Sequence, residues 1–358
     1  MSTPPKSGPN PHSAGVATGL YKVAIVGGAS LKGKEVAELL SDRNFPATDI
    51  KLLDDDESLG QLESMGDEVT FIQSVRSEQF ENIDFTFFAS DPECTKKNWK
   101  TAQHNGGAIV DLSYALEEEP TARLRAPWIE RELGKPSPSE LQPGPAVVAH
   151  PAAVVLALLA IRAKKAGRVS RMVATVYEPA SEHGQRGMDE LHQQTVNLLS
   201  FQQLPKGVFD TQVAFNMITR YGEASSPSLE EIERRVLNHL EHIAGPDEPR
   251  PALLLVQAPI FHGHAFSIFL EMEQSLALGD LAQALTGEHI SITRLASDSP
   301  SNVNAAGQGE ILVSVGRDTN HQHGYWLWAA ADNLRIAAIN AVETAESMFG
   351  SRPRGKIQ

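Results

Sequence analysis

The chain has 358 residues, which at about 150 residues per domain predicts two domains. Hydrophobic residues make up 41% and charged residues 21%, which is typical of a globular protein and excludes a collagen-like, coiled-coil or wholly disordered chain. The formal net charge of −14 makes nucleic acid a poor partner, and no run reaches the roughly 18 apolar residues that a membrane helix needs. The single cysteine, Cys94, excludes an intrachain disulfide and a four-cysteine zinc site, and it fits a reducing cytoplasm.

The first 20 residues are rich in Pro, Gly and Ser and have no apolar periodicity. They also lack the charged start and the apolar core of a signal peptide. We therefore predict a disordered tail over residues 1–20 and expect ordered structure from Tyr21 onward.

A strand, a glycine-rich turn and a helix are expected next. The apolar run Val23–Val26 leads into the turn over residues 27–33, and a helical stripe of Val36, Leu39 and Leu40 follows. This order is typical of a phosphate site at a helix N-terminus, although a tight turn without a ligand is the alternative. Further buried strands alternate with helical segments, and we expect them at 50–53, 84–89 and 108–111. The pattern predicts a doubly wound α/β domain over about 21–150.

A second, α+β domain is expected over about 151–330, beyond a Pro-rich stretch at 135–145. It opens with an apolar helix over 152–165 that stops at Gly167. An amphipathic helix over 229–243 starts at a capping box formed by Ser228 and Glu231. Strand-like runs at 171–177, 253–257, 266–273 and 311–316 predict a mostly antiparallel sheet, and a last helix is expected over about 330–349.

The acidic cluster Asp54–Glu57 ends the second strand of the first domain. These carboxylates can accept hydrogen bonds from a ribose but would repel a 2′-phosphate, so any bound dinucleotide is expected to be NAD rather than NADP. The alternative is a solvated acidic loop.

Five segments in a fixed order resemble the aspartate-β-semialdehyde dehydrogenase family: VAIVGGASLKGKEV from Val23, GMDEL from Gly187, AFN from Ala214, APIFHGHAFSIFLE from Ala258 and ADNLR from Ala331. The resemblance runs from about residue 21 to 350. It implies a Rossmann-type NAD(P)-binding domain, an α+β dimerisation and catalytic domain, and a C-terminal helix at 331–352 that returns to the first domain. It also implies a homodimer or homotetramer. The cofactor-binding positions would be Gly27, Gly28, Ser30, Leu31, Gly33, Asp54, Ser90 and Asn333.

Members of that family reduce an aspartyl phosphate through a cysteine thioester, with a histidine as acid/base and with cations that hold the anionic groups. The family's Asn-Pro-Asn-Cys element matches the segment that starts at His150, so the nucleophile position is Ala153, which cannot attack a carbonyl. His264 keeps the acid/base position and Glu230 keeps the amine-binding position. The other substrate-pocket positions are altered: Glu178 replaces glutamine, Gln257 and Glu117 replace arginines, and Glu233 replaces lysine.

These replacements remove three positive charges and add three negative ones, which opposes an acyl phosphate before any chemistry. We therefore expect the chain not to catalyse the family reaction. Three hypotheses remain: a silent relative that binds a nucleotide or assembles with an active paralogue, an NAD-dependent oxidoreductase that acts on a cationic or neutral substrate without a thioester, and a structural dimer that binds nothing.

Other candidate residues have plain structural interpretations. Without a thiol to serve, His264 is interpreted as a local hydrogen-bonding residue, and Cys94 lies outside the element that would face it. The pairs His239/His242 and His321/His323 are interpreted as surface histidines because no third ligand is suggested, so no metal site is predicted. Asp332, Asn333 and Arg335 are expected to pack the last helix.

Overall fold

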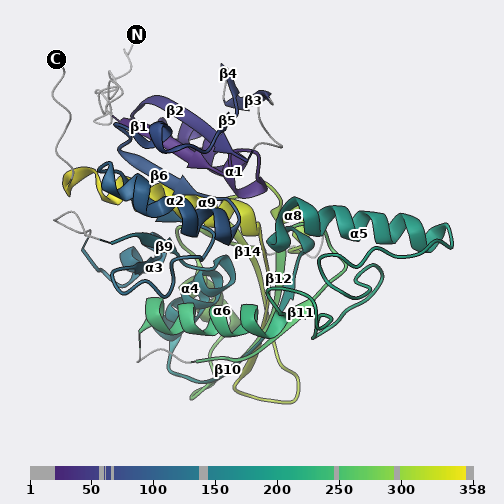
Figure 1. The fold of residues 1–358 in the computed structure, drawn as a ribbon. Coiled ribbons are helices and arrows are strands. Elements are labelled where there is room, and N and C mark those ends of the chain that lie inside the picture. Colours follow the sequence, from purple (N-terminus) through teal and green to yellow (C-terminus); the bar gives the residue numbers. More distant parts are fainter. Residues whose placement is uncertain are drawn as a thin grey trace, which may run out of the picture.

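A computed structural model describes residues 21–55, 60, 62–65, 68–136, 144–245, 250–293 and 299–351. Two sheets and the helices that cover them make up the fold (Figure 1). The predicted tail, and Asp56 and Glu57 of the acidic cluster, lie outside the described residues. Within the described parts of the chain, every helix is too short or too polar to cross a bilayer.

The first sheet is parallel throughout, in the order β5-β2-β1-β6-β7-β9-β8. Its central strands are almost fully buried, which explains their continuous apolar runs. The strands are β1 (Tyr21–Val26), β2 (Ala47–Asp54), β5 (Gln73–Ser74), β6 (Phe85–Phe88), β7 (Ala108–Asp111), β8 (Arg123–Arg125) and β9 (Ala146–Val148). A separate antiparallel pair is formed by β3 (Leu62–Met65) and β4 (Glu68–Phe71).

Helices cover both faces of this sheet: α1 (Leu31–Asp42), η1 (Ser77–Phe80), α2 (Pro92–His104), α3 (Pro127–Glu132) and α9 (Asn333–Ser347). The C-terminal α9 returns to the first domain and lies against α1 (Figure 1). Arg335 of α9 forms ion pairs with Glu35, Glu38 and Asp42 of α1, at 2.9–3.2 Å. A short 3-10 turn, Phe349–Ser351, follows, and Phe349 stacks on Tyr21.

The second sheet has the order β11-β10-β12-β15-β14-β13 and is mixed. The pairs β10–β11 and β13–β14 are parallel, and the other pairs are antiparallel, as a mostly antiparallel sheet requires. The strands are β10 (Val169–Glu178), β11 (Ala252–Gln257), β12 (His264–Met272), β13 (Ile290–Ile292), β14 (Ile311–Arg317) and β15 (Gly324–Ala331).

One face of the second sheet carries helices and the other remains partly open. The covering helices are α4 (Pro151–Ala166), α6 (Leu229–Ala244) and α7 (Leu278–Leu285). Along β12, Phe266, Ile268 and Leu270 are buried, and the intervening residues face the open side. The remaining helices are η2 (Ala180–His183), α5 (Gly184–Leu199), which projects from the body, and α8 (Asn302–Ala305) (Figure 1).

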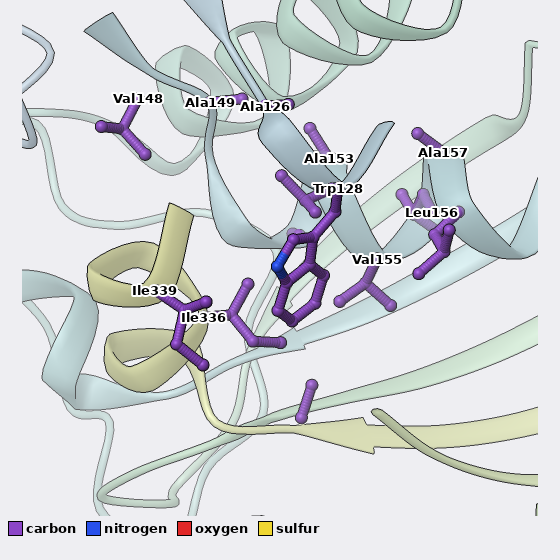
Figure 2. Packing of buried hydrophobic residues seen from close by; sticks show 14 of the residues in the cluster. Ala126, Trp128, Val148, Ala149, Ala153, Val155, Leu156, Ala157, Ile336 and Ile339 are labelled. Carbon is purple, nitrogen blue, oxygen red and sulfur yellow. The ribbon is translucent and has the colours of Figure 1, made fainter. Parts of the chain in front are cut away.

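Helix α4 lies at the centre of the hydrophobic core, in contact with α3, α6, α7 and α9. Its residues from Pro151 to Ala163 are all buried, which accounts for its Ala/Leu-rich sequence. Figure 2 shows Ala153 and Val155 of this helix packed beside Trp128, with Ile336 of α9 nearby. The core therefore joins elements of both halves of the chain.

Two sequence-based expectations are wrong in detail. Helix α9 begins at Asn333, with Asp332 as its N-cap, and Ala330 and Ala331 end the preceding strand β15. That strand was missed because only Asp332 and Asn333 separate its apolar run from the apolar helix that follows. His239, expected at the surface, is buried in α6 because it is on the apolar stripe with Val236 and Leu240.

Candidate functional site

His264 and Glu178 form a buried pair at the ends of two neighbouring strands. Glu178 ends β10 and His264 begins the antiparallel β12. The Nε2 atom of His264 lies 2.9 Å from Oε2 of Glu178, and both side chains are almost fully buried. Two buried atoms of the pair, Glu178 Oε1 and His264 Nδ1, have no hydrogen-bond partner within the protein. Because buried polar atoms normally find partners, this region has unused binding capacity.

A second carboxylate, Glu182, faces the same pair from η2. Its Oε1 accepts a hydrogen bond from Asn333 Nδ2 at 2.8 Å and lies 3.9 Å from His264 Nε2. Its Oε2 lies 3.7 Å from Nε2 of His150, which caps the N-terminus of α4 by accepting from Ala152 N–H. The start of α4, the end of β10, the turn η2 and the start of β12 therefore bring two histidines and two glutamates together.

Burial and charge act in opposite directions on these groups. Burial raises the pKa of Glu178. Burial also acts to raise the pKa of Glu182, but Lys32, His150 and His264 outweigh it and bring the pKa to about 2. Burial holds the pKa of His150 well below its ordinary value, so this ring is neutral. Burial acts most strongly on His264 and lowers its pKa, but Glu178, Glu182 and Asp332 together outweigh it, so the net shift is upward.

Lys32 brings a positive charge from the glycine-rich turn into this site. Its Nζ donates a hydrogen bond to the carbonyl of Leu112 at 3.3 Å and lies 4.7 Å from the centre of the Tyr114 ring. Arg235 of α6 also lies over this ring, at 4.9 Å, and the ring stacks on His150. Lys32 and Arg235 therefore bring positive charge to the site, which the charge changes inferred from the sequence did not include.

The predicted substrate-pocket residues have different partners. Glu178 and Gln257 lie at the His264 site, whereas Glu117 forms an ion pair with Arg235. Glu233 accepts a hydrogen bond from Leu255 N–H at 2.8 Å, and Glu230 is exposed with Arg234 at 3.7 Å. The carboxylates of Glu117, Glu230 and Glu233 are therefore each paired with a cation or a backbone N–H.

Gln257, at the position of a carboxylate-binding arginine, is tied into the protein. Its Nε2 donates to the carbonyls of Glu178 and Ala258, and its Oε1 accepts from Tyr221 at 2.6 Å. All polar atoms of this buried amide are used, so it braces the end of β10 beside Glu178.

No described side chain supplies a thiol near His264. Ala153 is fully buried in the first turn of α4, in the apolar core. Cys94 lies in α2, in a different hydrophobic cluster, with Asn98 as a neighbour. Burial raises the pKa of the Cys94 thiol, which makes it a poorer nucleophile.

The glycine-rich turn has the close packing of a nucleotide-binding turn. Gly27 has a φ of +86°, and a Cβ on it would lie 2.5 Å from Ser90 N. A Cβ on Gly33 would lie 2.0 Å from the carbonyl oxygen of Gly27, so only glycine allows α1 to start here. Ser30 is the N-cap of α1, since its Oγ accepts from Gly33 N–H and donates to the carbonyl of Ala89. The turn residues thus present the N-terminus of α1, a favourable place for a phosphate.

The remaining predicted cofactor positions have defined places. Leu31 begins α1, and Gly28 packs against Leu52. Asp54 accepts a hydrogen bond from Ala29 N–H at 2.7 Å, which places its carboxylate at the turn. Ser90 lies 3.2 Å from the hydroxyl of Thr95.

Asn333, the last of the predicted cofactor-binding residues, begins α9 and lies beside Glu182. It also accepts a hydrogen bond from Gly263 N–H at 3.1 Å. Its neighbours at the start of α9 have packing partners, as expected: Asp332 pairs with His262 at 2.7 Å and Arg335 with α1.

Sequence reasoning missed several residues of the site, namely Lys32, Tyr114, His150, Glu182, Tyr221, Arg235 and His239. Two signals were available. A lysine stands inside the glycine-rich turn, and ionisable residues follow the end of β10, where functional side chains often gather. The role of His239, which accepts from His150 N–H at 2.9 Å, depends on a contact 89 residues away along the chain.

Comparison with known families gives the class of protein. The NAD-binding domain of semialdehyde dehydrogenase matches residues 22–136, and the semialdehyde dehydrogenase dimerisation domain matches residues 158–336. The chain belongs to the semialdehyde dehydrogenase family.

Relatives within the family are more specific. The aspartate-semialdehyde dehydrogenase of Rickettsia bellii is 29% identical over 337 residues, which cover 92% of this chain and 98% of the relative. The USG-1 protein homolog of Azotobacter vinelandii is 28% identical over 333 residues, covering 91% and 97%. The structure of a probable aspartate-semialdehyde dehydrogenase from Pseudomonas aeruginosa has a TM-score of 0.81 at 27% identity and covers 92% of this chain and 98% of its own.

Proposed function

We propose that the protein binds a dinucleotide and self-associates, but does not carry out the phosphate-dependent oxidation of aspartate semialdehyde through a thioester. One observation carries this proposal: the position that matches the family nucleophile is Ala153, and the only cysteine in the sequence is Cys94 in α2. Loss of a covalent nucleophile alone costs up to about a million-fold in rate.

The altered anion-binding positions support the same conclusion. Gln257 has no charge to offer a carboxylate, and its amide is already used by Glu178, Ala258 and Tyr221. Arg235 is neutralised by Glu117, so it is not free to hold a phosphate. An acyl phosphate would therefore lack the cations that bind it in the family reaction.

The dinucleotide is proposed to be NAD rather than NADP. Asp54 is held at the glycine-rich turn by Ala29 N–H, so its charge would lie close to a 2′-phosphate on the ribose. Thermal-shift and calorimetric titrations with NAD, NADH, NADP and NADPH test this. Tighter binding of NADP than of NAD would reverse the preference, and no binding of any of them would favour the structural dimer.

Self-association is proposed to use the open face of the second sheet. Trp326 and Trp328 are 44% and 37% exposed on β15, and Val173 of β10 and Leu254 of β11 are exposed in the same sheet. Exposed apolar patches of this kind mark protein interfaces. A homodimer through this face is the simplest assembly, and the same surface is also available to an active paralogue.

The decisive enzymatic test compares the wild-type protein with Ala153→Cys. We expect neither to show phosphate-dependent oxidation of aspartate semialdehyde with NAD or NADP. The quadruple variant Ala153→Cys, Glu117→Arg, Glu233→Lys, Gln257→Arg has a better chance, because it also restores the lost cations. Turnover by the wild-type protein would refute the proposal, and turnover by the single variant would show that the cations matter little.

A second candidate function is supported by the buried His264–Glu178 pair. A histidine held by a carboxylate beside a dinucleotide can transfer a proton while a hydride moves to NAD, without any thioester. The carboxylates Glu178 and Glu182 would favour a neutral or cationic substrate. Reduction of NAD by a panel of neutral and amine-bearing alcohols and aldehydes tests it, with His264→Gln as the variant expected to lose turnover.

A further inference from the structure

Three ligand-type side chains converge in the buried site. One ligating atom from each of His150, Glu178 and Glu182 lies within 4.8 Å of the other two. Their side chains are 2%, 0% and 4% exposed, so the cluster differs from the acidic groups that are common on protein surfaces. Imidazole nitrogen and carboxylate oxygen together are ligands for zinc-class divalent metals.

Each carboxylate has one oxygen hydrogen-bonded to a neighbouring side chain and one oxygen without such a bond. Glu182 Oε1 is held by Asn333, and its Oε2 faces His150. Glu178 Oε2 is held by His264, whereas its Oε1 has no partner within the protein although the side chain is fully buried. A carboxylate with one oxygen anchored by a neighbour and the other oxygen unused resembles a metal ligand that is held by an outer hydrogen bond.

We propose that His150, Glu178 and Glu182 bind a divalent transition metal of the zinc class, with His264 and Asn333 as positioning residues. The imidazole ligand disfavours Mg²⁺ and Ca²⁺, which prefer oxygen ligands alone. Bonds of about 2.0–2.2 Å require ligand atoms roughly 3.5 Å apart, so the three side chains close inward slightly on binding. This proposal is independent of the proposed dinucleotide site.

Two features of the site set the conditions for binding. His150 Nδ1 accepts from Ala152 N–H, so the neutral ring carries its proton on Nε2. A metal can bind Nε2 only if this proton moves to Nδ1 and the cap to Ala152 is given up, or if the ring turns so that Nδ1 meets the metal. Lys32, whose charge acts on all three groups, opposes a second cation. Affinity should therefore rise with pH and should rise again when Lys32 is made neutral.

The test uses the full chain, stripped with a chelator and titrated with ZnCl₂ by calorimetry at pH 7.5. Cobalt(II) binding is followed by its visible absorption, which reports the ligand geometry. We expect one site of micromolar or tighter affinity, weakened on the order of 100-fold or more by Glu178→Gln and by His150→Asn. Both substitutions introduce the residues of the resembling family, which favours correct folding. Lys32→Met should tighten binding several-fold.

Matched surface variants complete the test. Glu93→Gln and His321→Asn change an exposed glutamate and an exposed histidine and should leave the affinity unchanged. Zinc binding that is lost in His321→Asn, or that persists unchanged in Glu178→Gln and His150→Asn, would overturn the proposal. So would the absence of binding at 100 μM zinc in the folded wild-type protein.

Discussion

At the residue scale, His264 and Glu178 form a buried, hydrogen-bonded pair of ionisable side chains that depend on each other. Charges in such a pair have lost their hydration, so removing one partner leaves the other uncompensated. The side-chain amides of Gln257 and Asn333 form hydrogen bonds around this pair. Because amides are uncharged, they hold the pair in place without adding charge to it.

Removing the histidine should therefore be costly. We expect His264→Ala to lower the free energy of unfolding by about 3–5 kcal/mol, because it leaves the Glu178 carboxylate buried and unpaired. Urea denaturation measures it. Adding Glu178→Gln to the same protein should recover part of the loss, while His321→Ala, at an exposed ion pair with Asp318, should cost less than about 1 kcal/mol. Equal losses at both histidines would contradict the interpretation.

The pH dependence of stability should report Glu182. Its pKa is about 2 in the folded protein against an ordinary 4.5, so the folded state binds fewer protons than the unfolded chain between these values. Its contribution of about 3 kcal/mol is fully present above pH 4.5 and is lost as the pH falls toward 2. Denaturant titrations at pH 3 and pH 6 should show a smaller difference for Glu182→Gln than for the wild-type protein. An unchanged difference would assign the acid sensitivity to other groups.

At the scale of single elements, the glycine-rich turn and α1 are built around one close approach. Gly33 is helical, yet its missing side chain is what lets α1 start against the carbonyl of Gly27. Helix propensity alone would favour alanine over glycine both at Gly33 in α1 and at Gly279 in α7. Packing overrides this preference at Gly33, whereas nothing opposes alanine at Gly279.

Gly33→Ala should destabilise the protein by about 3 kcal/mol and weaken dinucleotide binding, because its Cβ would lie 2.0 Å from the Gly27 oxygen. Gly279→Ala in α7 is the matched control. It has no atom within 4 Å of the added Cβ and should stabilise the protein by about 0.5–1 kcal/mol. Thermal denaturation with and without NAD measures both effects. A tolerated Gly33→Ala would mean that the turn can open without cost.

At the scale of the whole molecule, two covered sheets share a core through α4 and α9, but one face of the second sheet remains open. Trp326 lies near Phe269, and Trp328 lies near Tyr177, so aromatic side chains line that face. Aromatic residues are enriched at protein interfaces, which makes this face the expected contact between two copies.

The double variant Trp326→Lys, Trp328→Lys should shift the protein from dimer to monomer at micromolar concentration, because it places like charges at the centre of the contact. Light scattering and sedimentation velocity measure the change. Phe201→Ser, at a 99% exposed residue beyond α5, is the control and should leave the dimer intact. A variant that remains dimeric would place the contact on another surface.

The sequence by itself determined the scaffold: the parallel first sheet, the capped α6, the apolar α4 and the family, because each depends on local periodicity or on motifs that are contiguous in the chain. It also determined that Ala153 cannot act as a nucleophile. The strand β15 escaped notice because its apolar run has no turn before α9.

Only the tertiary structure decided the composition of the site. Lys32, His150, the neighbours Glu178 and Glu182, and His264 come from four parts of the chain that are far apart in sequence, and no local pattern encodes their distances. The ion pair between Glu117 and Arg235 was likewise decided by the fold. In it, the positive charge of Arg235 neutralises the negative charge that the sequence analysis expected at Glu117. Side-chain contacts across strands and helix ends depend on how the whole chain packs, so charge and ligand geometry at the site were fixed only by the fold.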